Sequence, residues 1–123
     1  MSEHIFFYTG LSLFTIHEMD AVRCKEWRIF PGLSFLDDRW GFRIFMFAHI
    51  PIFLFIYRQL HDVPTSETFM KGFNVFLMVH MGFHLLYLKH KRNEFTDGIS
   101  WFYIAGAGIC GIVDLLNPFF DNS

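Results

Sequence analysis

Cysteine is scarce in this chain of 123 residues, which contains only Cys24 and Cys110. The two fall in different hydrophobic segments, so we expect reduced thiols and no disulfide framework. The net charge of −2 argues neither for nor against a nucleic-acid partner. No basic groove with interleaved aromatic residues is present, so we expect no such partner. The period-two alternation of β-strands is also missing. This excludes a transmembrane barrel, which needs at least about eight such strands.

Hydrophobic residues are abundant instead. They make up 53% of the chain, and the 18 phenylalanines exceed what one small soluble core could bury. Each apolar stretch has roughly the 17 to 25 residues that cross about 30 Å of hydrocarbon. The sequence therefore predicts an all-α, polytopic four-helix membrane bundle that forms a single domain over residues 1–123. The predicted helices cover about residues 5–22, 42–57, 69–88 and 99–116.

The connections between these stretches differ in charge. One side of the predicted bundle carries only two basic residues, Arg58 and Lys71, together with both termini. The positive-inside rule then puts both termini on the non-cytoplasmic side, and we expect an integral protein of a bacterial inner (cytoplasmic) membrane. The other side carries eight basic residues, namely Arg23, Lys25, Arg28, Arg39, Arg43, Lys89, Lys91 and Arg92.

Four of the seven histidines lie inside the predicted helices: His17, His49, His80 and His84. Counting residues along each helix puts them roughly 6–12 Å inside the cytoplasmic boundary, at one shared depth. An ionisable side chain in hydrocarbon is costly and usually faces the interior of the bundle, which makes it a candidate functional residue. The alternative is a buried polar network in which the histidines hydrogen-bond across helices and fix their register. Neutral imidazole is a good ligand for borderline metals. The sequence therefore predicts a transition-metal site, most simply a zinc site, with these four ligands.

Carboxylates near this depth are candidate catalytic residues. Asp20 follows His17 by three residues and shares its helix face, so it could join the metal or move protons. Glu18 points about 100° away from His17 and could meet a neighbouring helix, lie at the interface or carry a proton. Glu26 begins the first loop, where it could fold back as a ligand or acid/base, or remain solvated.

The run His17-Glu18-Met19-Asp20-Ala21 near the end of a first membrane helix resembles the motif of the HXXEE-type family of small four-helix bacterial membrane proteins. Asp20 stands where that motif has its first Glu, and Ala21 stands where it has the second. A role that needs two carboxylates is therefore not implied. More distantly, histidines and an Asp inside a membrane resemble the zinc sites of membrane ceramidases and adiponectin-receptor-like hydrolases, which have seven helices.

Several functions follow from these residues. The first is a zinc-dependent hydrolase that acts on a lipid-like small molecule, with Asp20, Glu18 or Glu26 moving protons. The second is a metal-free acid/base isomerase or lipid-binding protein, similar to emopamil-binding-type four-helix proteins. A bis-His haem carrier is the third. The fourth is an accessory subunit that packs on a larger membrane complex. Membrane lipids are the expected surroundings, and a homo-oligomer is compatible with all four.

Overall fold

The structure, a computed structural model, describes residues 4–121, with side chains as far as Asn117. It contains four α-helices and one short 3-10 helix, and the described part of the chain has no strand. The all-α, four-helix prediction is therefore confirmed. The elements are α1 (Ile5–Arg23), η1 (Glu26–Arg28), α2 (Asp38–His61), α3 (Val63–Leu86) and α4 (Gly98–Asp121).

The middle two helices are longer than their apolar stretches. The backbone N–H of Trp40 donates to the Asp37 side chain at 2.9 Å, which caps α2 four residues before the predicted start. Only Asp62 separates α2 from α3, and Pro64 lies in the first turn of α3, where its missing N–H costs nothing. Counting apolar residues underestimates both helices because backbone hydrogen bonding continues through the polar residues at their ends.

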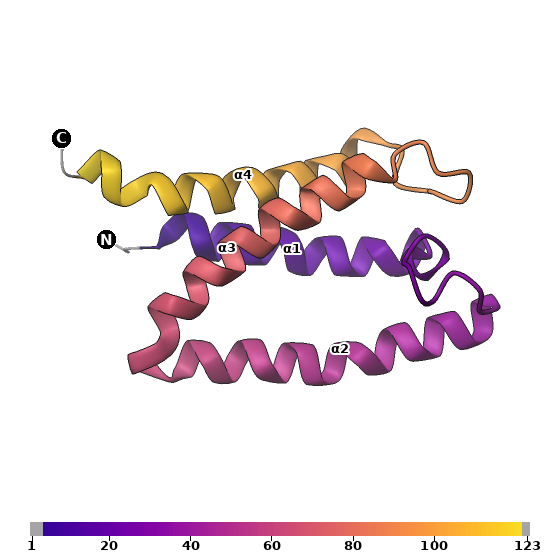
Figure 1. Cartoon of the computed structure of the whole chain (residues 1–123), viewed down its shortest axis with the longest axis horizontal. Coiled ribbons are helices and arrows are strands. Elements are labelled where there is room, and N and C mark those ends of the chain that lie inside the picture. The colour runs from indigo at the N-terminus through magenta and orange to yellow at the C-terminus, as the bar shows by residue number, and fades with distance from the viewer. Residues whose placement is uncertain (1–3, 122–123) are drawn as a thin grey trace.

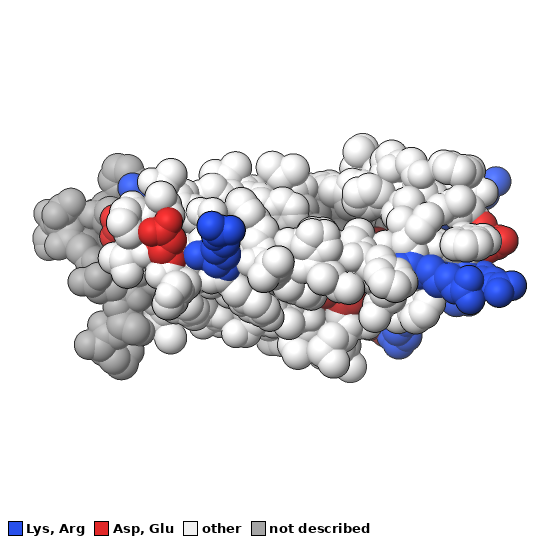
Figure 2. Space-filling model, turned by 90° about the horizontal axis from the view of Figure 1, so that it is seen from below, with Lys and Arg blue, Asp and Glu red and all other residues white. Residues whose placement is uncertain are grey.

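Three helices are long and apolar enough to cross a membrane: α2, α3 and α4 as far as Asn117. α1 is not among them, although its apolar run was expected to span, because His17, Glu18 and Asp20 lower its mean hydropathy. Only 17% of the apolar window of α2 is buried, as expected of a helix that faces lipid. Figure 2 shows a broad, mostly uncharged belt on this side of the molecule, with one small acidic patch in it and most of the visible charged side chains toward its two ends.

The helices pack unequally. α1 and α3 both lie against α4, whereas α2 stands apart and contacts mainly α3 and η1 (Figure 1). Small residues on α4 allow the close contact with α3: a Cβ added at Gly108 would lie 2.7 Å from Met81 Sδ, and one at Gly111 would lie 2.8 Å from the Asn74 carbonyl oxygen. α1, α3 and α4 therefore form the packed body, and α2 forms one wall of a more open space.

The two ends of the molecule differ. α1 begins and α4 ends at the same end, where the α2–α3 turn also lies (Figure 1). The two longer connections, residues 24–37 and 87–97, lie at the opposite end. Eight of the ten Lys and Arg residues belong to this loop end or to the helix turns beside it.

Candidate functional site

Three of the predicted histidines meet inside the bundle. His17 comes from α1, while His80 and His84 lie one turn apart on α3 and face it. The centroid of the His17 ring lies 4.6 Å from that of His80 and 4.9 Å from that of His84, and the two α3 rings are 4.6 Å apart. All three residues are buried, with exposed fractions of 0, 9 and 2%. The sequence pattern therefore located the core of the cluster.

Glu26 completes this cluster from outside the long helices. Its carboxylate oxygens lie 3.7 Å from His17 Nε2 and 3.6 Å from His84 Nε2. The chain reverses just before it, where Lys25 adopts the left-handed conformation with φ of 52°. That conformation is costly for a residue other than glycine and has no clear sequence signal. One potential ligand atom from each of His17, Glu26, His80 and His84 lies within 4.8 Å of the others.

These four side chains are buried without the hydrogen bonds that burial demands. Within the described part of the chain, both ring nitrogens of His17 and His80 lack a partner, as do His84 Nε2 and Glu26 Oε2. Unpartnered buried polar atoms are rare and costly. The separations of 3.6 and 3.7 Å between Glu26 and the two imidazoles exceed a hydrogen bond. Two ligands held at about 2.0–2.1 Å by one tetrahedral ion lie about 3.3 Å apart, close to these separations.

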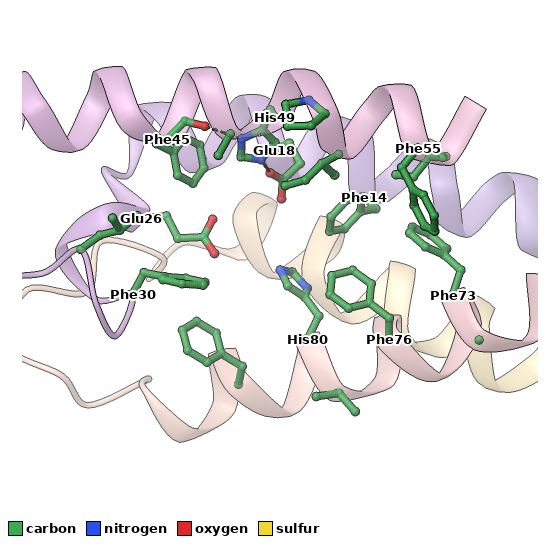
Figure 3. A pocket seen from close by; sticks show the side chains of 18 of the residues that line it. Phe14, Glu18, Glu26, Phe30, Phe45, His49, Phe55, Phe73, Phe76 and His80 are labelled. Atoms are coloured by element: carbon green, nitrogen blue, oxygen red, sulfur yellow. Dashed lines mark hydrogen bonds and ion pairs between the residues drawn. The ribbon is translucent and has the colours of Figure 1, made fainter. Parts of the chain in front are cut away.

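His49 lies beside this cluster and not within it. Its Nε2 makes a short contact with Glu18 Oε2, and the other oxygen of Glu18 lies 3.8 Å from His17 Nε2. Glu18 thus links His49 to His17, and Figure 3 shows it beside His49 at the pocket. Glu26 occupies the place that the sequence assigned to His49 as fourth ligand, and His49 contacts Glu18 instead.

The hydrogen bonds of His49 indicate where one proton lies. Its Nδ1 is 2.6 Å from the carbonyl oxygen of Phe45, which can only accept, so Nδ1 carries a hydrogen. The contact between Nε2 and Glu18 then needs one more proton, which either partner can hold. The Glu18–His49 pair is therefore a shared-proton pair at the wall of the site.

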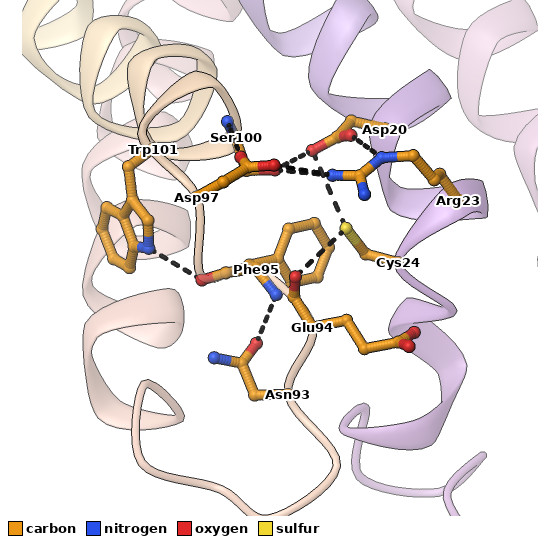
Figure 4. A network of polar contacts seen from close by, with 9 residues as sticks. All are labelled: Asp20, Arg23, Cys24, Asn93, Glu94, Phe95, Asp97, Ser100 and Trp101. Atoms are coloured by element: carbon orange, nitrogen blue, oxygen red, sulfur yellow. Dashed lines mark hydrogen bonds and ion pairs between the residues drawn. The ribbon is translucent and has the colours of Figure 1, made fainter.

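Asp20 takes no part in the cluster. It accepts hydrogen bonds from Arg23 Nε at 2.8 Å and Ser100 Oγ at 2.5 Å, while the Ser100 N–H donates to Asp97 at 2.7 Å (Figure 4). That N–H holds the pKa of Asp97 below its usual range. Asp20 shares a helix face with His17, but it is hydrogen-bonded to Ser100 at the start of α4 instead. Its observed role is to join the end of α1 to α4.

Cys24 borders the same network. Its Sγ lies 3.6 Å from the Glu94 carbonyl oxygen and 3.9 Å from Asp20. Burial, with a smaller contribution from the Asp20 carboxylate, raises the pKa of this thiol to about 11. Cys24 therefore remains a neutral thiol at physiological pH and lies outside the histidine cluster.

A large pocket adjoins the cluster. Its volume is about 940 Å³, near the upper end of the range for small-molecule sites, and it lies between α2 on one side and α1, α3 and the first loop on the other. Figure 3 shows Glu18, Glu26, His49 and His80 facing it in one region, with phenylalanines extending from them toward the α2–α3 turn. The aromatic lining includes Phe14, Phe55, Phe69, Phe73, Phe76 and Phe83. The pocket therefore offers a mostly apolar space with a few polar groups.

No curated protein and no solved structure is significantly similar to the chain. One family model matches residues 3–119, nearly the whole chain, and its description is that of a family of unknown function. The match covers every residue of the cluster and of the pocket wall. Because this match covers nearly the whole chain, the chain belongs to the family of unknown function DUF6713.

Proposed function

We propose that His17, His80 and His84 bind a transition-metal ion beside Glu26, and that zinc is the ion they suit best. Three neutral imidazoles are a ligand set that zinc favours in catalytic sites. The observation that carries the proposal is the convergence of four buried side chains whose polar atoms have no hydrogen-bond partner in the described chain. A bound ion would satisfy one ring nitrogen of each histidine. Without one, their burial would be a large uncompensated cost.

The reaction that we propose is metal-dependent hydrolysis of a lipid-like substrate. A bound zinc ion lowers the pKa of water toward about 7 and polarises a carbonyl group. Three protein ligands would leave a position open for this chemistry, whereas four would close the site. We therefore assign the three histidines as ligands and Glu26, which faces the pocket, as the acid/base. Glu18, joined to His49, is a second proton-carrying candidate, and Asp20 is a positioning residue.

Element analysis tests the metal site. We expect protein purified without a metal-affinity tag to contain about one metal ion per chain, and the His80→Ala, His84→Ala double variant to lose it. His61→Ala and His90→Ala are the controls, since neither residue belongs to the cluster. Size-exclusion chromatography and circular dichroism should accompany each measurement. A folded double variant that keeps stoichiometric metal would show that the proposed site is wrong.

A metal-free acid/base enzyme, such as an isomerase, is the second candidate. The shared-proton pair Glu18–His49 at the pocket wall favours it, because such a pair can give and take a proton without an ion. Wild-type protein free of metal that retains its fold would support this alternative. We rank haem below both, since a haem held by two axial histidines needs room between rings that here lie 4.6 to 4.9 Å apart.

The membrane assignment adds two proposals. The loop end, with its eight basic residues, would face the cytoplasm of a bacterial inner membrane. The exposed apolar side of α2 would face lipid. The same side could contact a second copy or a larger complex, which is how an accessory subunit would use it.

A further inference from the structure

The pocket beside the cluster has a polar part and an apolar arm. Along α3 the arm runs from His80 to Phe69, which is about 16 Å at 1.5 Å per residue. Phenylalanines and aliphatic residues of α2 and α3 line it. Because the bonds of an extended alkyl chain zigzag, each carbon advances the chain by about 1.25 Å, and a chain of about twelve to fourteen carbons fits this length. The arm therefore matches one alkyl chain in length and in chemistry.

The pocket is open toward the side of the molecule. Four of its lining residues lie on α2 and α3 and are exposed, with exposed fractions of 43% for Ile52, 56% for Phe55, 43% for Phe76 and 64% for Val79. In a bilayer these side chains would contact lipid tails. A ligand can therefore enter sideways between α2 and α3, without passing through water.

Charge decides which head group fits. The lining contains Glu18 and Glu26 but no Lys or Arg, so nothing in it complements a phosphate. The polar part is also deep, because His80 precedes the last residue of α3 by six positions, or about 9 Å. Phospholipid head groups lie at the membrane surface instead. The head that fits is small and uncharged, with oxygen atoms that can accept or donate hydrogen bonds.

From this geometry we infer that the pocket binds a single-chain lipid with a small uncharged polar head, taken up sideways from the leaflet next to the loop end. The head lies among Glu18, Glu26, His49 and His80, and the chain lies along the phenylalanines toward the α2–α3 turn. This orientation is that of a lipid in the same leaflet. The claim that this lipid is the substrate rests on the proposed function. The claim that the pocket binds it does not.

Two glycines on α3 provide a matched test. A Cβ added at Gly72 or at Gly82 would meet nothing within 4 Å, so both positions have room for a side chain. Gly72 lines the pocket, whereas Gly82 is exposed and does not line it. Gly72→Phe should fill the arm, and Gly82→Phe should leave it empty. If Gly72→Phe fails to fold, Val79→Trp at the opening replaces it.

The measurement is equilibrium binding of tritiated dodecylglycerol ether to the protein in phospholipid nanodiscs, with empty nanodiscs subtracted. An ether cannot be hydrolysed as an ester would be. We expect saturable binding to wild type and Gly82→Phe, and binding at least about tenfold weaker to Gly72→Phe, since lost burial of a few methylene groups suffices for this. The phosphate ester of the same ether should bind at least about tenfold more weakly to wild type.

Equal binding by all three proteins would overturn the inference, and so would equal or tighter binding of the phosphate ester. Metal content is measured on the same samples. Stoichiometric metal without lipid binding would refute this inference alone. Lipid binding by a protein without metal would refute the proposed metal site and leave the pocket assignment standing.

Discussion

At the scale of single residues, the packing of the helices decides which of the predicted side chains enter the cluster, which the sequence pattern could not. His17, His49 and Asp20 all lie at a suitable depth, yet only His17 enters the cluster. The reason is the partner that each one meets. His49 meets Glu18, and Asp20 meets Ser100 and Arg23. Residue spacing gives depth and helix face, whereas the identity of the neighbour depends on how the helices pack.

Replacing Glu26 by Gln distinguishes a ligand from an acid/base. If three histidines hold the metal, Glu26→Gln should keep about one ion per chain, while hydrolysis of a lauroyl ester should fall by about 10² to 10⁴. Element analysis and an ester assay provide the two readouts. Glu94→Gln, an exposed carboxylate of the other loop, is the control. Loss of the metal on Glu26→Gln would instead indicate a closed four-ligand site and would argue against hydrolysis.

Cys24 should be nearly inert to thiol reagents at neutral pH. Its pKa of about 11, against an ordinary value of 9.0, keeps the reactive thiolate scarce. We expect labelling of a Cys110→Ala variant by iodoacetamide to be much slower before unfolding than after, and to accelerate between about pH 9 and 11. Because the folded protein binds this proton more tightly, its contribution to stability is complete below pH 9 and is lost as the pH rises through 11. Rapid labelling of folded protein at pH 8 would contradict this assignment.

At the scale of elements, the position of Glu26 depends on how η1 is fixed to α2. The Trp27 indole N–H donates to Asp38 at 3.1 Å, and Arg28 Nε donates to the same carboxylate at 2.9 Å. Gly41 of α2 lies directly under the Trp27 ring, where a Cβ would overlap the indole. The first loop is thereby held against α2, and Glu26 is directed inward.

Gly41→Ala should therefore disturb the loop that positions Glu26, although Gly41 is not part of the cluster. The added methyl group displaces Trp27 and should destabilise the protein by about 1–3 kcal/mol, as overpacking usually does. Gly82→Ala is the matched control, because that position is open and Ala favours a helix by about 1 kcal/mol. Thermal unfolding in detergent measures both changes. A Gly41→Ala variant as stable as wild type would mean that the Trp27 contact does not hold the loop.

The sequence predicted the elements better than their connections. The apolar stretches located four helices, but the helix ends near Asp62 were missed because polar residues there continue the helical hydrogen bonding. His80 and His84 were predicted together because spacing along a helix fixes a face, and His17 was grouped with them because counting residues put it at the same depth. Glu26 was named only as one of several options, since its position depends on a left-handed Lys25 and on Trp27 packing, and neither can be read from spacing.

At the scale of the whole molecule, the start of α1 and the end of α4 lie opposite the loops that carry most of the basic residues (Figure 1). The positive-inside rule therefore makes one prediction for the entire chain, with both ends outside the cytoplasm. A phosphatase reporter, which is active only outside the cytoplasm, should be active when fused to the C-terminus. A green fluorescent reporter exported through the Sec pathway should stay dark there. The opposite pattern would reverse the orientation of all the helices and place the metal site near the outer surface.

The location of Glu26 outside the long helices has a consequence for the rate at which a metal ion would exchange. His17, His80 and His84 are held by α1 and α3, whereas Glu26 is held by η1, which packs on α2. If the loop opened, an ion would be able to enter from the aqueous side without movement of the histidine helices. Exchange of bound metal with a chelator should then be faster in Gly41→Ala than in wild type, because its loop docks less firmly. On this proposal the segment that places Glu26 would also control access to the site, so the rate of metal exchange would depend on how firmly the first loop packs on α2 rather than on the histidines.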